Sequence, residues 1–102
     1  MAEVIIARNA DADLERLATF LRNEEPAAAL AISTLVHGAL RVLRTYPSIG
    51  RPVDHVLREL VISRGNAGYL VLYEYDARAD QVVVLALRHQ REVGYLERGA
   101  TE

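Results

Sequence analysis

The sequence predicts a single α+β domain in which a helical hairpin packs on one face of an antiparallel sheet, in the order β-α-α-β-β-β. Apolar residues recur with helical spacing in the first half of the chain and alternate along short segments in the second half. The chain has 102 residues, of which 51% are hydrophobic and 25% are charged, which is typical of a globular protein with one core. We assign residues 1–98 to this domain and residues 99–102 to a short C-terminal tail.

The chain is expected to begin with a short strand and a helix. Residues 3–8 include the β-branched run Val4-Ile5-Ile6, which favours a strand, and Asn9-Ala10-Asp11 then interrupts it. Asp11 is placed to cap the helix that follows. One face of that helix is marked by apolar residues at i, i+3, i+4 and i+7, which are Leu14, Leu17, Ala18 and Leu21. They predict a helix over about residues 11–23.

A second helix is predicted from Pro26 to about Thr45. Proline is favoured at the first helical position, and the two acids before it suit the positive end of a helix. The helix must end before Pro47, because a proline disfavours the α conformation in the residue that precedes it. Its apolar stripe is Ala29, Ile32, Val36, Leu40 and Leu43. The short link between the two helices predicts an antiparallel hairpin.

The second half of the chain predicts a three-stranded meander. Residues 47–54 are rich in turn-forming residues and form the one long loop. Alternating segments then follow at residues 57–64, 69–75 and 81–88, with turns at residues 65–68 and 76–80. In the last segment the odd and the even positions are both apolar, so both faces of that strand favour burial.

The composition excludes several classes of chemistry. The chain has no cysteine, so disulfides and thiolate catalysis are absent, and it has no lysine, so Schiff-base and P-loop chemistry are absent as well. The net charge of −2 lacks the signature of a non-specific nucleic-acid binder. Neither a cofactor motif nor a set of residues at metal-ligand spacing is present, and we expect no cofactor and no metal. The N-terminal residues do not resemble a signal peptide, so a cytoplasmic location is expected.

Three tyrosines of one strand predict a surface that binds a partner. Tyr69, Tyr73 and Tyr75 share one side of that strand, and two helices can cover only one face of the sheet. Tyrosine is enriched at interfaces, where one end of the side chain is apolar and the other polar. The alternative is that these tyrosines complete the core by packing on the loop and the tail.

Basic residues gather at the end of the last strand, in Arg88-His89-Gln90-Arg91, and the meander would bring Arg64 near them. Arginine binds phosphate, so Arg64, Arg88 and Arg91 are candidate target- or phosphate-binding residues. His89, Arg91 and Tyr95 are a candidate catalytic set for RNA cleavage, with histidine as the base. Alternatively, this cluster caps the sheet, pairs with nearby acids or binds an acidic partner protein.

Several segments, in order along the chain, resemble the RelE/ParE superfamily of bacterial toxin-antitoxin toxins, and most closely its ParE-like, or plasmid stabilisation, branch. These segments are Ala12-Asp13-Leu14, Leu40 to Leu43, Tyr46-Pro47-Ser48-Ile49-Gly50-Arg51-Pro52, Leu57-Arg58-Glu59-Leu60, Gly68-Tyr69-Leu70-Val71-Leu72-Tyr73 and Val84 to Glu92. The resemblance implies the fold derived above and a growth-inhibiting toxin that a cognate antitoxin neutralises.

The same resemblance implies two possible targets. ParE-like toxins are associated with DNA gyrase, which such a toxin would inhibit by binding, whereas RelE-like toxins are ribosome-dependent mRNA endoribonucleases. Val61 and Ser63 stand where the RelE-type pattern has lysines, and Leu70 stands where it has arginine. Of its catalytic set, only Arg91 and Tyr95 carry over. We therefore expect a toxin that acts on gyrase by binding; the alternatives are an endoribonuclease and an inactive family member.

Overall fold

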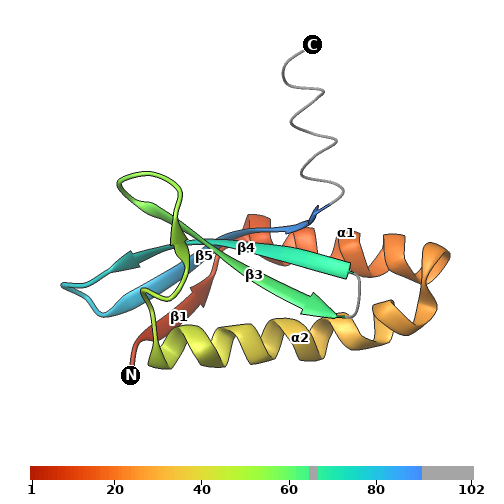
Figure 1. Ribbon diagram of the computed structural model, residues 1–102, viewed down its shortest axis with the longest axis horizontal. Coiled ribbons are helices and arrows are strands. Elements are labelled where there is room, and N and C mark those ends of the chain that lie inside the picture. The colour runs from red at the N-terminus through yellow and green to blue at the C-terminus, as the bar shows by residue number, and fades with distance from the viewer. Residues whose placement is uncertain (65–66, 91–102) are drawn as a thin grey trace, which may run out of the picture.

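Two helices lie on one face of a five-stranded sheet (Figure 1). This computed structural model describes residues 1–64 and 67–90 of the chain. The strands are β1 (Glu3–Ile6), β2 (Arg51–Pro52), β3 (Leu57–Arg64), β4 (Ala67–Asp76) and β5 (Gln81–His89). The helices are α1 (Arg8–Glu24) and α2 (Pro26–Thr45), which form a hairpin that turns at Glu25. The α+β class and the helical hairpin on the sheet are therefore confirmed.

The strands lie in the order β1-β5-β4-β3-β2, so β5 is an inner strand. β3, β4 and β5 form the predicted antiparallel meander, and β2 adds a short antiparallel pair inside the predicted loop. β1, however, runs parallel to β5, with Val4 opposite Val82, so the expectation of a wholly antiparallel sheet is wrong for this pair. Alternation along a strand predicts which way its side chains point, but not the direction of its neighbour.

The helix boundaries follow the predicted ones, with one difference. α1 begins at Arg8 with Ala7 as its N-cap residue, and the Asp11 N–H donates to the Ala7 carbonyl at 3.1 Å. Asp11 therefore lies in the first turn rather than at the cap, where its charge still suits the helix dipole. α2 has the predicted bounds. By length and composition it is apolar enough to cross a membrane, but it is also a core helix, with buried residues at Ala28, Ile32, Val36, Ala39 and Leu43.

The prediction that the tyrosines of β4 form an uncovered surface is wrong. Tyr69 and Tyr73 are 0% exposed and belong to the core beneath the helices, and Tyr75 is partly buried against that core. Tyr75 Oη donates to Asp80 Oδ1 at 2.8 Å, which raises the pKa of Tyr75. A strand has two faces, and its alternation alone does not say which one the helices cover. Here the larger, aromatic face is buried.

Tyr73 also holds the loop between α2 and β2 in place. Its Oη accepts a hydrogen bond of 2.8 Å from the Gly50 N–H. Arg58 Nη1 donates to the carbonyl oxygens of Ser48, at 3.0 Å, and of Gly50, at 2.8 Å. A Cβ atom at Gly50 would lie 2.6 Å from Tyr73 Oη and 3.0 Å from the Glu59 carbonyl oxygen. Glycine at this position is therefore required by the close approach of the loop to the sheet.

We predict that Gly50→Ala destabilises the protein by about 1–3 kcal/mol, because the added methyl group must displace a buried tyrosine ring or a strand. Urea unfolding followed by circular dichroism measures this change. Gly38→Ala is the matched control, since a Cβ there meets nothing within 4 Å. In a helix that change should stabilise by up to about 1 kcal/mol. Equal effects of the two substitutions would contradict the role of Gly50.

Burial of Tyr73 also predicts a pH dependence at alkaline pH. Burial raises the pKa of Tyr73 above its ordinary value, and only the hydrogen bond from Gly50 and the charge of Arg58 oppose this. The folded state therefore holds the phenol proton more tightly than the unfolded state. This stabilisation is complete below about pH 10 and is lost as the pH rises through the raised, folded-state pKa.

Tyr73→Phe should remove that part of the pH dependence. The variant is expected to be less stable than the wild type at neutral pH by about 1 kcal/mol, because it lacks the hydrogen bond to Gly50. The difference between the two proteins should then shrink above about pH 10. Unfolding curves at several pH values between neutrality and pH 11 measure it, and a difference that stays constant with pH would contradict the effect.

Candidate functional site

A β-bulge in β5 decides which way the residues at its end point. Tyr73 pairs with Val84 and Leu72 pairs with Ala86, so Leu85 is an extra residue in β5. One extra residue inverts the alternation of all the residues that follow it. The faces of residues 86–89 are therefore opposite to those that an unbroken strand would present.

The bulge places His89 on the face that the helices cover. His89 is 9% exposed, and its ring meets the ring of Tyr69 edge to face, with centroids 5.2 Å apart and an interplanar angle of 89°. A general base must come within hydrogen-bond distance of the group that it deprotonates. A ring that is buried against a core tyrosine does not offer that access, so the position of His89 does not favour the predicted catalytic role.

Helix α1 completes the outer edge of β5 beyond the end of β1. The Ala7 N–H donates to the Val84 carbonyl at 2.9 Å. One turn into the helix, the carboxylate of Asp13 replaces a neighbouring strand, and its Oδ2 accepts the Leu87 N–H at 3.0 Å. Asp13 is 7% exposed, which is unusual for a carboxylate and is explained by this bond and by the ion pairs it makes.

Asp13 also neutralises Arg88, one of the predicted phosphate-binding residues. Arg88 Nη1 lies 2.7 Å from Asp13 Oδ2, and Arg16 Nη2 lies 3.5 Å from Asp13 Oδ1. The Arg88 side chain is 32% exposed, so it is only partly open to solvent. An arginine that already compensates a buried carboxylate is a poorer phosphate ligand than a free one. We assign Arg88 a structural role.

The structure does not describe the other predicted site residues fully. The backbone of Arg64 pairs with that of Ala67 at the ends of β3 and β4, but its side chain lies outside the described part. Arg91 and Tyr95 lie outside the described residues, as does the predicted tail. Among the described residues, no group of three His, Cys, Asp or Glu side chains could hold a metal ion.

The sheet has an open face on the side away from the helices; an uncovered face was expected from the sequence, but with the tyrosines of β4 on it rather than the residues found there. The strand registers and the alternation of burial place the following residues on it. The apolar ones are Ile5, Leu57, Val61, Leu70, Leu72, Val83 and Ala86. The charged ones are Glu3, Arg51, Glu59, Glu74, Asp76 and Arg88. We call this surface the open face; it is apolar at its centre and mostly acidic in its charges.

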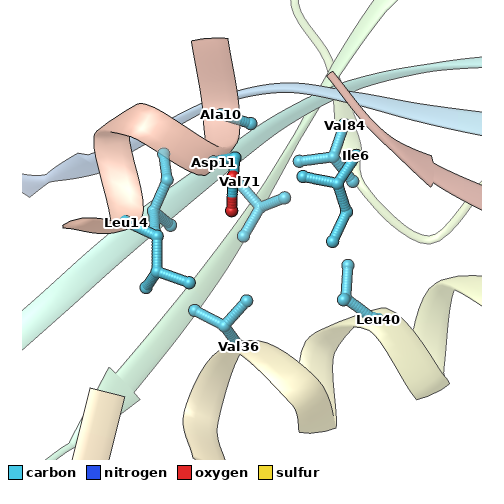
Figure 2. A pocket seen from close by; sticks show the side chains of 9 residues that line it. Ile6, Ala10, Asp11, Leu14, Val36, Leu40, Val71 and Val84 are labelled. Atoms are coloured by element: carbon cyan, nitrogen blue, oxygen red, sulfur yellow. The ribbon is translucent and has the colours of Figure 1, made fainter. Parts of the chain in front are cut away.

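A second apolar feature lies between the helices and the sheet (Figure 2). Its lining comes from the end of β1, from both helices and from β4 and β5, and consists of Ile6, Ala10, Asp11, Leu14, Val36, Leu40, Val71, Val84 and Leu87. Asp11 is the one ionisable residue in this lining. Such a groove can accept an apolar side chain, but it lacks the paired acid and base of a catalytic centre.

The bond network of Asp13 leads to a test of its structural role. Asp13→Ala leaves the Leu87 N–H and the partly buried Arg88 cation without their partner, so we expect a loss of about 2–4 kcal/mol in the free energy of unfolding. Asp13→Asn keeps one acceptor and should lose less. Glu15→Ala, an exposed position of the same helix, should stay within about 0.5 kcal/mol of the wild type. Chemical unfolding measures all three; equal stability of Asp13→Ala and Glu15→Ala would refute the role.

The sequence is similar to a family of known proteins and to several of its members. The family model for the ParE toxin of the type II toxin-antitoxin system, parDE, matches residues 4–94. The toxin RelE3 of Caulobacter vibrioides is 32% identical over 92 residues, which cover 90% of this chain and 98% of that toxin. The toxin RelE1 of the same organism is 34% identical over 70 residues, which cover 69% of this chain and 75% of that toxin.

A solved structure has the same fold. It is the toxin-antitoxin complex RelBE2 from Mycobacterium tuberculosis, in which the similar chain has a TM-score of 0.53 and 24% sequence identity. The match covers 86% of this chain and 96% of that one, and at this identity it concerns the fold. Because the family model covers nearly the whole chain, the resemblance seen in the sequence is confirmed. The chain belongs to the ParE toxin family of type II toxin-antitoxin systems, within the RelE/ParE superfamily.

Proposed function

We propose that this toxin acts in the cytoplasm by binding DNA gyrase, and that a cognate antitoxin neutralises it. The observation that carries the proposal is that the histidine and the arginine at the end of β5 both have structural contacts within the fold. His89 is buried against Tyr69, and Arg88 is bound to Asp13 at 2.7 Å. The described residues that would serve RNA cleavage there are therefore already used by the fold. What the described residues at this end of the sheet offer to solvent is surface for binding.

The open face supports binding to protein rather than to RNA. In β3 and β4, Val61 pairs with Leu70 and Ser63 with Gly68. Val61, Ser63 and Leu70 are the positions where the interferase pattern has basic residues, and here they are apolar or neutral. Affinity for a nucleic-acid backbone comes mainly from Lys and Arg, and base recognition in single-stranded RNA uses exposed stacking groups. Neither kind of group dominates this surface.

Two further observations support an antitoxin partner. The family is defined by toxins of toxin-antitoxin systems, and the structural neighbour from Mycobacterium tuberculosis is a toxin-antitoxin complex. In addition, large apolar side chains of the helical hairpin are exposed, including Phe20 at 51% and Leu30 at 85%. Exposed apolar residues of this size are characteristic of surfaces that bind another protein.

A ribosome-dependent mRNA endoribonuclease is the second candidate. It is favoured by the relatives from Caulobacter vibrioides, both of which are named RelE toxins. In that case the ribosome and mRNA are the partners, and His89, Arg91 and Tyr95 are the catalytic set. Substitution of each of them should then abolish toxicity while the antitoxin still binds.

The deciding experiment is pulse labelling of DNA and protein synthesis in the first minutes after induction of the chain in bacteria that lack its antitoxin. We expect DNA synthesis to fall first, together with a DNA-damage response, because an inhibited gyrase stops replication. Cells that also express the antitoxin are the control and should show neither effect.

A fall in protein synthesis before DNA synthesis would overturn the gyrase proposal and favour the endoribonuclease. Arrest of neither process, with the protein present and folded, would mean an inactive copy. The order in which the two labels fall separates the first two outcomes, and an unchanged rate of both identifies the third.

A further inference from the structure

The open face is left without a covering layer by the described part of the chain. All the buried residues of the core cluster from β4 and β5 lie on the opposite face, which packs against the helices (Figure 1). On the open face, Val61 is 50% exposed and Ile5 is 41% exposed. Leu70, Leu72 and Val83 between them are half-buried. Together they form an apolar strip that crosses four strands, which is larger than the scattered exposed residues of an ordinary surface.

A carboxylate for which the described residues supply no partner lies at the centre of this strip. Glu74 is half-buried and stands between Leu57 on β3 and Val83 on β5, with Leu72 two residues before it on the same face. Glu59, by contrast, forms an ion pair with Arg51. Among the described residues, none forms an ion pair or a side-chain hydrogen bond with Glu74. A carboxylate in apolar surroundings favours a cation that would pair with it when water is excluded.

The open face carries mostly acidic residues, and this charge determines what kind of partner surface is complementary to it. Glu3, Glu59, Glu74 and Asp76 lie on this face. Among the described residues the registers place two basic residues there, Arg51 and Arg88, and each is held by a carboxylate, Arg51 by Glu59 and Arg88 by Asp13. An acidic surface repels nucleic acid but attracts a basic protein surface, and surfaces that hold DNA are basic. DNA gyrase must present such a surface to its substrate.

We propose that the open face binds the basic, DNA-holding surface of gyrase, with an arginine or lysine of gyrase on Glu74 and apolar residues of gyrase on the strip around Val61 and Leu72. The inference rests on the proposed function and names the surface that performs it. Helix α2 carries charge of the opposite sign: no acidic residue occurs from Pro26 to Val53, and Arg41 and Arg44 are exposed on this helix. A partner that fits α2 therefore does not fit the open face.

The test is inhibition of gyrase supercoiling by the purified full chain, measured beside capture of the chain by its antitoxin. Glu74→Arg should raise the concentration for half-inhibition at least tenfold, because it places like charges together at the centre of the contact. Glu74→Gln should give a smaller rise. Val61→Arg, at an exposed position, should also weaken inhibition. Glu15→Arg makes the same change of charge on the exposed side of α1 and should leave inhibition unchanged.

A thermal melt of each variant checks that the proteins whose inhibition of gyrase is compared are all folded. If the wild-type chain inhibits gyrase and the Glu74 and Val61 variants inhibit equally well, the open face is not the contact, and the inference fails while the proposed function stands. Loss of antitoxin capture with gyrase inhibition intact would assign the face to the antitoxin and overturn the inference too. A wild-type chain without effect on supercoiling would overturn both.

Discussion

The incomplete edge of β5 is the constraint on which the arrangement of the molecule depends. β1 pairs with residues 81–84 only, so the backbone groups of β5 that face away from β4 beyond that point need another partner. Asn9 Nδ2 donates to the Leu85 carbonyl at 3.4 Å, and Asp13 accepts the Leu87 N–H and holds Arg88. These bonds fix α1 along the sheet, α1 fixes α2 through the hairpin, and the two helices together determine which face of the sheet becomes the core.

Much of this architecture could be predicted from local patterns. The bounds of α2 follow from Pro26 and Pro47, and the bounds of the meander follow from its turn residues. The parallel pairing of β1 could not be predicted, because no local pattern encodes the direction of a neighbour that is distant in the sequence. The two-residue strand β2 is equally hidden, since it contains Pro52 and is set by its pairing with β3.

The site was harder to predict than the fold, and the bulge at Leu85 is the main reason. Odd and even positions of β5 are both apolar, so an extra residue does not change the hydrophobic pattern. It nevertheless turns His89 into the core and Arg88 toward the open face. The tyrosines of β4 were expected on the wrong side for a different reason, because alternation does not say which face of a strand the helices cover. The place of Glu74 could not be predicted because a single acid in a strand usually means only exposure to solvent. The apolar residues that pair with it, Leu57 and Val83, belong to other strands.

The residues of β4 point alternately to the core and to the open face, so two different constraints act on the residues of one strand. Tyr69, Val71 and Tyr73 are locked into the core, where a change in volume costs stability, whereas Leu70, Leu72 and Glu74 on the other face contribute less to it. Mutations at the second set can therefore accumulate without loss of the fold. A genome that carries several duplicated toxins of this kind can diversify what each one binds, and keep the copies insulated from one another, while every copy retains the same scaffold.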